Sequence, residues 1–497
     1  MTARRVVRNS AYLFASRVVG IVCTVIVVAV AARYLGVNLF GFFALISAVA
    51  MVLHPLSDFG LEDILCREVV RRPLDASVFV SSVLLVRLGL FSLILGCSAA
   101  VLHWSTSWPA DVKLGGCLLL AAELLMALTQ NYLGVMRAQE RMQYVLLVIS
   151  FQRVVTTLAV VFAAWFDLGF FGLAAGRAIT SFCSLLLAAQ ITYRRFVPFV
   201  ARFDRKFAMY ALREGFPLAI YVVLLALLFK TGVFFLQFMG TAQDVSFYES
   251  ANRLVTQLQV IPMSIAAAVF PILARVGPAR ENEARMTTYY QLMGKFMFLA
   301  GLGCSVLLAV GSYPMMRVVC GPAFRGAGAA LLALAPSAVF LFLVSLQHRF
   351  LVALNCQHIN TWSILAALLI NAASNVVLSP RLGHVGAGVA ATFAYAGLCT
   401  SNSWFLARRG LRMRWSQAHG KALAMAVVCL AFAWVHLPAE WMTLAVRMIL
   451  VGIVYCGGLL LGRVVTPDEW TLFRTSLRSR QARPPVGSAE EASQLQE

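Results

Sequence analysis

The sequence has 497 residues, of which 61% are hydrophobic and only 12% charged, with a mean hydropathy of +0.81. A soluble protein cannot bury so much apolar surface, so the composition indicates a membrane protein with many spans. The formal net charge of +20 lies mostly in short segments between apolar runs, and no basic-aromatic motif accompanies it. We therefore expect membrane lipids, and no nucleic acid, as partners of this charge.

Fourteen stretches of the chain are apolar enough and long enough to cross a bilayer, which takes about 20 residues each. We expect an all-α polytopic fold with about fourteen transmembrane helices. The predicted spans are 10–31, 40–60, 78–102, 114–135, 144–165, 169–191, 215–239, 247–273, 289–311, 328–354, 358–378, 385–406, 420–437 and 441–462.

The cations between these spans are distributed unevenly. One set of loops, together with both termini, carries most of the arginines and lysines, and the other set carries only Arg33, Lys113, Arg317, Arg325 and Arg381. Because positive loops remain in the cytoplasm, this asymmetry predicts that both termini are cytoplasmic.

The longest internal loop is basic and divides the first twelve spans into two sets of six, as in transporters built from two similar bundles. We expect a first bundle in 1–192, a cytoplasmic linker in 193–214, a second bundle in 215–410 and two added helices in 411–465. Residues 466–497 are polar and rich in Pro, Ser, Gln and Glu, which predicts a disordered cytoplasmic tail.

Single cations interrupt six of the apolar runs. A charge at the centre of a membrane helix costs about 2.5–3.5 kcal/mol on insertion scales, and such residues usually face a bundle interior or a water-filled cavity. Four of the six share a helical face with polar or small residues, a fifth does so less clearly, and the sixth is surrounded by apolar side chains. The four are Arg17, Arg153, Arg177 and Arg253. The fifth is Lys230, and the sixth is Arg87.

The first five cations are therefore the candidate site for an anion, and Arg87 is a weaker candidate. The alternative is that they bind backbone carbonyls or neighbouring helices without a role in transport. Glu123 is the one acid that the sequence places clearly inside these spans, with Asp58 near a helix end. It could couple transport to a proton or sodium ion, or form a salt bridge with a neighbouring arginine.

The sequence gives little support for an enzymatic function. The seven histidines are scattered, no paired carboxylates or metal-ligand spacings occur, and no phosphate-cradling glycine-rich loop is present. We therefore expect a transporter without catalytic residues, metal or cofactor. A membrane polysaccharide polymerase or glycosyltransferase is less favoured because every predicted outer loop is short.

Several short motifs occur in one order along the chain. They are Ala31–Gly36 with Phe40–Phe43, Asp58–Leu61 with Arg67-Glu68, Tyr248–Leu254 with Ile261-Pro262 and Phe270–Ala274, Cys320–Phe324, and Asn371, Asn375, Pro380, Gly383 and Gly386–Thr392. In this order they resemble the polysaccharide-unit flippases of the multidrug/oligosaccharidyl-lipid/polysaccharide exporter superfamily.

The resemblance implies a V-shaped pair of six-helix bundles around a central cavity, working by alternating access in the bacterial inner membrane. It implies as substrate an undecaprenyl-diphosphate-linked oligosaccharide for exopolysaccharide, capsule or O-antigen synthesis, and as partners the polymerase and export proteins of the same pathway. It also implies that cavity cations engage the diphosphate, with Arg17 and Arg253 reaching from opposite bundles. Arginine suits this task because its planar fork donates two hydrogen bonds and stays charged.

Two alternatives lie within the same superfamily. Fourteen spans are closer to the peptidoglycan-precursor flippases than to twelve-span relatives. A multidrug exporter is disfavoured because organic cations need acidic and aromatic cavities, whereas the excess of buried charge here is positive.

Overall fold

The computed structural model describes residues 3–104, 108–266, 283–354, 356–431 and 441–464. These residues form helices and turns, with no strand among them, so the predicted all-α class is confirmed. The first helices along the chain are α1 (Ala3–Asp58), α2 (Leu61–Arg71), α3 (Ala76–Trp104), α4 (Ala110–Ala138), α5 (Met142–Trp165) and α6 (Gly169–Arg195). They are followed by α7 (Arg205–Met239), α8 (Ala242–Gln257), α10 (Glu283–Cys320), α11 (Ala327–Leu334), α12 (Ser337–Ala353), α13 (Gln357–Arg408), α14 (Gln417–Leu430) and α15 (Trp441–Leu461).

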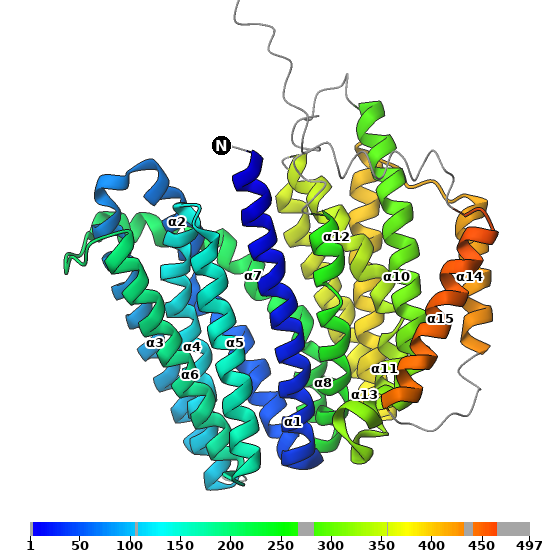
Figure 1. Ribbon diagram of the computed structural model, residues 1–497, viewed down its shortest axis with the longest axis horizontal. Coiled ribbons are helices and arrows are strands. Elements are labelled where there is room, and N and C mark those ends of the chain that lie inside the picture. Colours follow the sequence, from blue (N-terminus) through cyan, green and yellow to red (C-terminus); the bar gives the residue numbers. More distant parts are fainter. Residues whose placement is uncertain (1–2, 105–107, 267–282, 355, 432–440, 465–497) are drawn as a thin grey trace, which may run out of the picture.

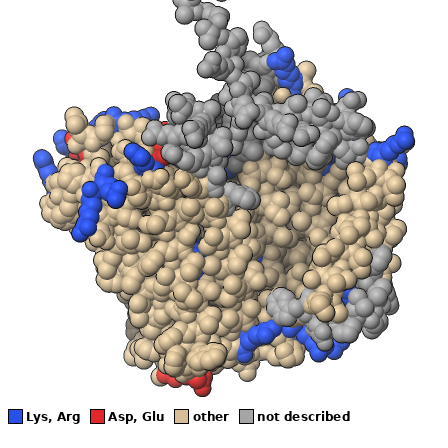
Figure 2. All heavy atoms as spheres, in the orientation of Figure 1, with Lys and Arg blue, Asp and Glu red and all other residues tan. Residues whose placement is uncertain are grey.

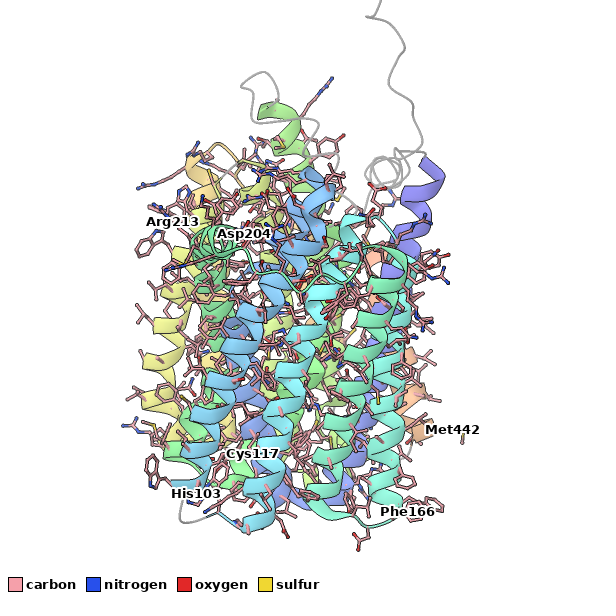
Figure 3. All side chains as sticks on the ribbon, turned by 90° about the vertical axis from the view of Figure 1, so that its left-hand side faces the viewer. His103, Cys117, Phe166, Asp204, Arg213 and Met442 are labelled. Atoms are coloured by element: carbon pink, nitrogen blue, oxygen red, sulfur yellow. The ribbon has the colours of Figure 1, made fainter. Side chains whose placement is uncertain are left out.

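The helices lie side by side in two groups, α2–α6 and α8 with α10–α13 (Figure 1). Helices α1 and α7 contact both groups, and α14 and α15 pack on α10 at the outer edge. We call the end at which Asp204 and Arg213 lie the basic end, and the end with His103 and Phe166 the opposite end (Figure 3). Figure 2 shows lysines and arginines gathered at the basic end, above a broad belt with very little charge, and a smaller cationic group and an acidic group at the opposite end.

Two helices are too long to cross a bilayer once. At 1.5 Å per residue, the 56 residues of α1 would extend about 84 Å, against a hydrocarbon core of about 30 Å. Each is broken at a glycine with positive φ, Gly36 (φ 68°) in α1 and Gly383 (φ 53°) in α13. Beside Gly383, Asp244 accepts hydrogen bonds from the backbone N–H and the Nδ1 of His384, at 3.2 and 2.7 Å. Such breaks need glycine because other residues are strained at positive φ.

The number of spans stays a prediction. Nine helices of the described chain are long and apolar enough to cross a membrane, and the pair α11–α12, bent by 43°, is a tenth candidate. This count treats Ala15–Arg71, which includes most of α1 and all of α2, as one helix and His358–Arg408 of α13 as another. It includes neither α8 nor α14, which have 16 and 14 residues, while parts of the predicted spans 247–273 and 420–437 lie outside the described residues.

The loop between the sixth and seventh predicted spans is shorter than the predicted 193–214. Helix α6 continues to Arg195, and α7 begins at Arg205, where the Asp204 carboxylate caps it by accepting from the N–H groups of Lys206 (2.9 Å) and Phe207 (3.1 Å). Apolar periodicity did not reveal this start because the first turns of α7 are basic, whereas a capping aspartate satisfies the free N–H groups of a first turn. The predicted tail, 466–497, lies outside the described residues.

The apolar cores show where the two groups are joined. One cluster contains residues of both groups, including Leu119 of the first and Tyr248 and Leu331 of the second, together with Ala44 of α1, and lies toward the opposite end. A second cluster belongs to α2–α6 and the start of α7, and a third to α10 and α12–α15 with Ala266. The groups therefore share a core at the opposite end and have separate cores elsewhere.

Polar contacts reinforce the closure at the opposite end. Arg33 of α1 donates to the backbone carbonyls of Val318 and Val319 in the last turn of α10, the latter at 3.1 Å from Nε. Phe40 packs edge-on against Phe324, with ring centroids 5.5 Å apart. A Cβ on Gly41 would lie 2.5 Å from the carbonyl oxygen of Ala242, so only glycine permits this approach of α1 to α8.

We predict that Arg33→Ala opens the opposite end. The change removes charge-assisted hydrogen bonds worth about 1.5–3 kcal/mol, which would raise the open population roughly tenfold or more. Spin labels on Trp165→Cys and Phe238→Cys, in a background without native cysteines, would report the separation of the groups by pulsed electron paramagnetic resonance. We expect an added population at longer distance, and an unchanged distribution in the control Arg325→Ala, an exposed cation at the same end. An unchanged distribution in Arg33→Ala would show that the apolar contacts alone close this end.

Candidate functional site

A cavity of about 750 Å³ lies between the two helix groups. Its walls come from α1, α4, α5 and α6 on one side and from α7, α8 and the residues that follow α8 on the other. Arg137 and Met142, which flank the turn between α4 and α5, also line it, so the cavity reaches the basic end. All five cations that the sequence predicts for the site line this one cavity: Arg17, Arg153, Arg177, Lys230 and Arg253.

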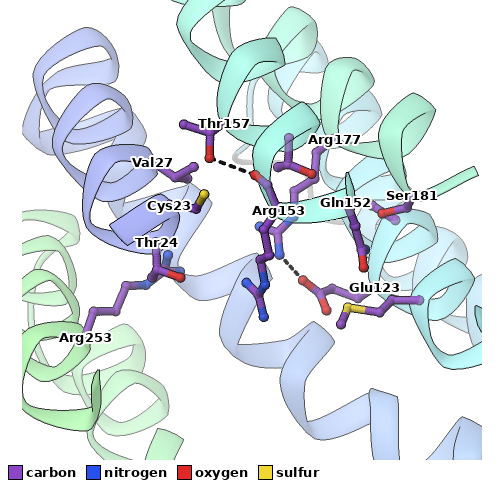
Figure 4. Close-up of a pocket in the computed structure, with 13 residues that line it drawn as sticks. Cys23, Thr24, Val27, Glu123, Gln152, Arg153, Thr157, Arg177, Ser181 and Arg253 are labelled. Atoms are coloured by element: carbon purple, nitrogen blue, oxygen red, sulfur yellow. Dashed lines mark hydrogen bonds and ion pairs between the residues drawn. The ribbon is translucent and has the colours of Figure 1, made fainter. Parts of the chain in front are cut away.

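A side recess of about 120 Å³ leads from this cavity into the first group, between α1, α4, α5 and α6 (Figure 4). Arg153 and Arg177 extend into it from α5 and α6, beside Glu123 of α4, while Arg253 of α8 reaches toward the same space from the second group. Thr157, one turn after Arg153, donates to the backbone carbonyl of Arg153 at 2.8 Å. The recess therefore gathers guanidinium groups of both helix groups around one small space.

Glu123 forms an ion pair with Arg177. Of the two interpretations left open by the sequence, the structure shows the salt bridge. Both side chains keep about a fifth of their surface exposed, 21% for Glu123 and 23% for Arg177, so the pair borders the cavity and is not enclosed in a core.

A second carboxylate, Glu249 of α8, was missed. The expectation that Glu123 is the one acid clearly inside these spans is wrong, because the Glu249 side chain is completely buried. Its Oε1 atom lies 2.5 Å from the ammonium Nζ of Lys230 on α7 and 2.9 Å from Nε of Arg253. A signal existed in the sequence, since Glu249 precedes Arg253 by four residues and side chains at that spacing meet on a helix.

The other cations have weaker partners. Arg17 donates from Nη1 to the Ser264 hydroxyl at 3.4 Å. No carboxylate of the described residues forms an ion pair with the Arg153 guanidinium, whose side chain is exposed to the cavity. Arg137, which also lines the cavity, is neutralised by Glu62.

The cavity therefore carries an excess of positive charge. Its five predicted cations face two carboxylates, Glu123 and Glu249, which leaves three positive charges without a fixed counter-charge among the described residues. One of the cations also links the two groups, because the Arg253 guanidinium lies over the ring of Phe43 on α1, 5.4 Å from its centroid. Such a cavity is chemically suited to hold an anion with several acceptor oxygens.

Arg87 lies apart from the cavity, as its apolar neighbours indicated. Only 1% of it is exposed, and it forms an ion pair with Asp58 and donates to the carbonyl of Ala127 at 2.7 Å. It therefore joins α3 to α4 and to the end of α1, which is a structural task.

One protein-family model matches more than half of the chain. A family model described as "Polysaccharide biosynthesis protein" matches residues 6–276. A curated relative, an uncharacterised membrane protein of Methanocaldococcus jannaschii, is 20% identical over 229 residues, which are 45% of each chain, so the match spans less than half of that relative.

Among solved structures, the lipid II flippase MurJ in an inward closed conformation superposes with a TM-score of 0.72 at 15% identity, over 90% of this chain and 98% of that one. A multidrug resistance MATE family transporter of the MOP superfamily, in an inward-facing conformation, gives 0.62 at 14% identity, over 79% and 94%. At these identities the similarity establishes the fold alone.

We predict different effects on stability for Arg87, which is buried, and Arg153, which faces the cavity. Arg87→Met leaves the Asp58 carboxylate without its cation, which should cost about 3–5 kcal/mol, whereas Arg153→Met removes no ion pair and should change stability by less than about 1 kcal/mol. Thermal unfolding of the purified variants in detergent would then show a clearly lower midpoint for Arg87→Met alone. Equal midpoints would contradict the division between a structural and a cavity arginine.

Proposed function

Because the chain belongs to the polysaccharide biosynthesis protein family and has the fold of MOP superfamily transporters, we propose that it flips undecaprenyl-diphosphate-linked oligosaccharide units. The transfer would cross the bacterial inner membrane and supply exopolysaccharide, capsule or O-antigen synthesis, together with the polymerase and export proteins of that pathway. The observation that carries the proposal is the excess positive charge of the cavity, contributed by both helix groups.

The chemistry of the substrate matches this cavity. The diphosphate that links an oligosaccharide to a prenyl chain is a dianion with several acceptor oxygens, and arginine forks bind such groups through paired hydrogen bonds. Arg153 and Arg177 in the recess and Arg253 facing it are placed to contact one diphosphate from both groups. Arg17 and Lys230 line the larger space beside the recess, where they and Arg253 would contact the same diphosphate as it enters and leaves the recess.

The volume of the cavity suits the headgroup of such a lipid, that is, its sugars and diphosphate. Its volume of about 750 Å³ lies in the range of sites for ligands of a few rings. We infer that the sugars and the diphosphate enter the cavity while the prenyl chain stays among the membrane lipids.

The arrangement of the cores supports alternating access. We infer from the concentration of cations that the basic end faces the cytoplasm, with both termini. The cavity reaches that end, while the shared core and the Arg33 contacts close the opposite one. The substrate would load from the cytoplasm and leave after the groups rock about the shared core. When the diphosphate engages Arg177, Glu123 loses its partner and becomes a candidate for coupling to a proton or sodium ion.

A peptidoglycan-precursor flippase is the second candidate. It is favoured by the superposition with the lipid II flippase over 90% of this chain. A diphosphate is common to both substrates, so the cations do not separate them. A multidrug exporter remains disfavoured by the positive cavity, because organic cations would be repelled.

We predict that Arg17→Ala, Arg153→Ala and Arg253→Ala each reduce polymer export at least tenfold at normal protein levels. Each change removes charge-assisted hydrogen bonds to phosphate worth about 1.5–3 kcal/mol. Export would be measured as surface polymer in a deletion strain complemented with each variant. The control is Arg71→Ala, an exposed cation outside the cavity. Wild-type export in all three variants would overturn the site.

The two candidate substrates predict different phenotypes in the deletion strain. A repeat-unit flippase leaves lipid-linked repeat units on the cytoplasmic face while the cell wall grows normally. A peptidoglycan-precursor flippase instead causes accumulation of the cell-wall precursor and lysis. Radiolabelled lipid extracts of the deletion strain distinguish the two, and accumulation of neither lipid would contradict both.

A further inference from the structure

Glu249 occupies an unusual position for a carboxylate in an apolar helix. Its side chain has no exposed surface, and one oxygen, Oε1, accepts from both Lys230 and Arg253. The other oxygen, Oε2, is buried and has no hydrogen-bond partner in the described part of the chain. Buried polar oxygens are nearly always bonded, so an orphan on a charged group needs an explanation.

The groups around this carboxylate come from each side. Lys230 faces it from α7, Tyr248 and Arg253 from α8 itself, and Tyr395 from α13. The helices α1 and α10 add Phe43 and Cys320 beside Arg253. The charge of Glu249 is therefore held in place by two cations.

Lys230 and Arg253 contact both the Glu249 carboxylate and the cavity. Lys230 and Arg253 line the cavity, whereas Glu249 does not. An anion that enters the cavity can reach the ammonium and guanidinium groups directly but cannot reach the carboxylate. Glu249 thus competes with the substrate for these two cations and neutralises one positive charge of the site when no substrate is bound.

Substrate binding must change the electrostatic environment of the Glu249 carboxylate. A diphosphate that draws Lys230 and Arg253 toward the cavity leaves the carboxylate without counter-charges, at a position where its side chain has no exposed surface. An unpaired buried charge is so unfavourable that such a group becomes neutral instead. Glu123 differs, because a fifth of its side chain is exposed and water can replace Arg177.

We propose that Glu249 binds one proton when a diphosphate engages Lys230 and Arg253, and releases it when the diphosphate leaves. The proton is supplied by the buffer through the aqueous cavity and adds to Oε2, the carboxylate oxygen that accepts no hydrogen bond from either cation. This inference rests on the proposed function and identifies a proton as the ion linked to substrate binding. It also explains how the empty carrier and the loaded carrier each avoid an uncompensated buried charge.

The proposed proton uptake predicts the direction in which pH changes the affinity for the lipid. Because binding takes up a proton, the affinity for the diphosphate lipid should rise as the pH falls. The slope should approach about tenfold per pH unit where Glu249 is charged in the free protein and neutral in the complex.

The test uses the full-length protein in nanodiscs and undecaprenyl-diphospho-N-acetylglucosamine, a diester without a phosphate that titrates near neutrality. Calorimetric titrations in buffers of different ionisation enthalpy give the number of protons taken up per lipid bound. We expect about one for the wild type and close to none for Glu249→Gln, which should also lose the pH dependence of binding. Glu123→Gln changes the other carboxylate of the site and should keep the proton uptake, and the matched control is Glu214→Gln, an exposed carboxylate outside the cavity, which should keep both.

A second variant keeps the inference testable if Glu249→Gln does not fold. Lys230→Met with Glu249→Gln replaces the buried ion pair by neutral side chains of similar volume, a change that proteins tolerate well. It should bind the lipid through the remaining arginines without proton uptake. Proton uptake that persists in both Glu249 variants, or that disappears in Glu123→Gln instead, would overturn the inference. Lipid binding by the wild type without proton uptake overturns this inference alone, whereas absence of lipid binding overturns the proposed function with it.

Discussion

The structure is organised around one constraint, that a charge inside an apolar helix must be paired or hydrated. Removing an ion from water costs several kcal/mol even after the protein relaxes. Arg87 meets this constraint with Asp58 and a backbone carbonyl, enclosed within the first helix group. The other five cations meet it by facing a common cavity, where two carboxylates neutralise part of their charge. The remaining positive charge is the reason we propose that the cavity binds an anion.

The same cavity depends on how the two groups are held together. A continuous apolar core joins them at the opposite end, and Arg33 adds hydrogen bonds to the last turn of α10. Elsewhere each group has a core of its own, so the space between them is left to polar side chains and the cavity. A protein built in this way can exchange one closed end for the other without unfolding either core.

The sequence predicted much of this arrangement, for physical reasons that differ between its parts. Long apolar runs and isolated cations are local signals, so the all-α class and the candidate cavity residues could be predicted. Arg87 was distinguished from the others because its helical neighbours are apolar.

What the sequence missed depended on contacts between helices. Glu249 was overlooked because its pairing with Lys230 joins α7 to α8, and only its spacing from Arg253 was a local signal. The start of α7 at Arg205 follows from the cap at Asp204 and not from apolar periodicity. The Arg33 contacts join residues more than 280 positions apart, which a single sequence does not reveal.

The most direct measurement is an electron cryomicroscopy structure of the protein in nanodiscs that contain its diphosphate-linked lipid. The account predicts density for the diphosphate in the recess, within about 4 Å of the guanidinium groups of Arg153 and Arg177, and facing Arg253. It also predicts that the prenyl chain extends into the lipid and that the ion pair between Arg177 and Glu123 is broken. A headgroup that lies outside the cavity, or one that leaves these arginines untouched, would contradict it.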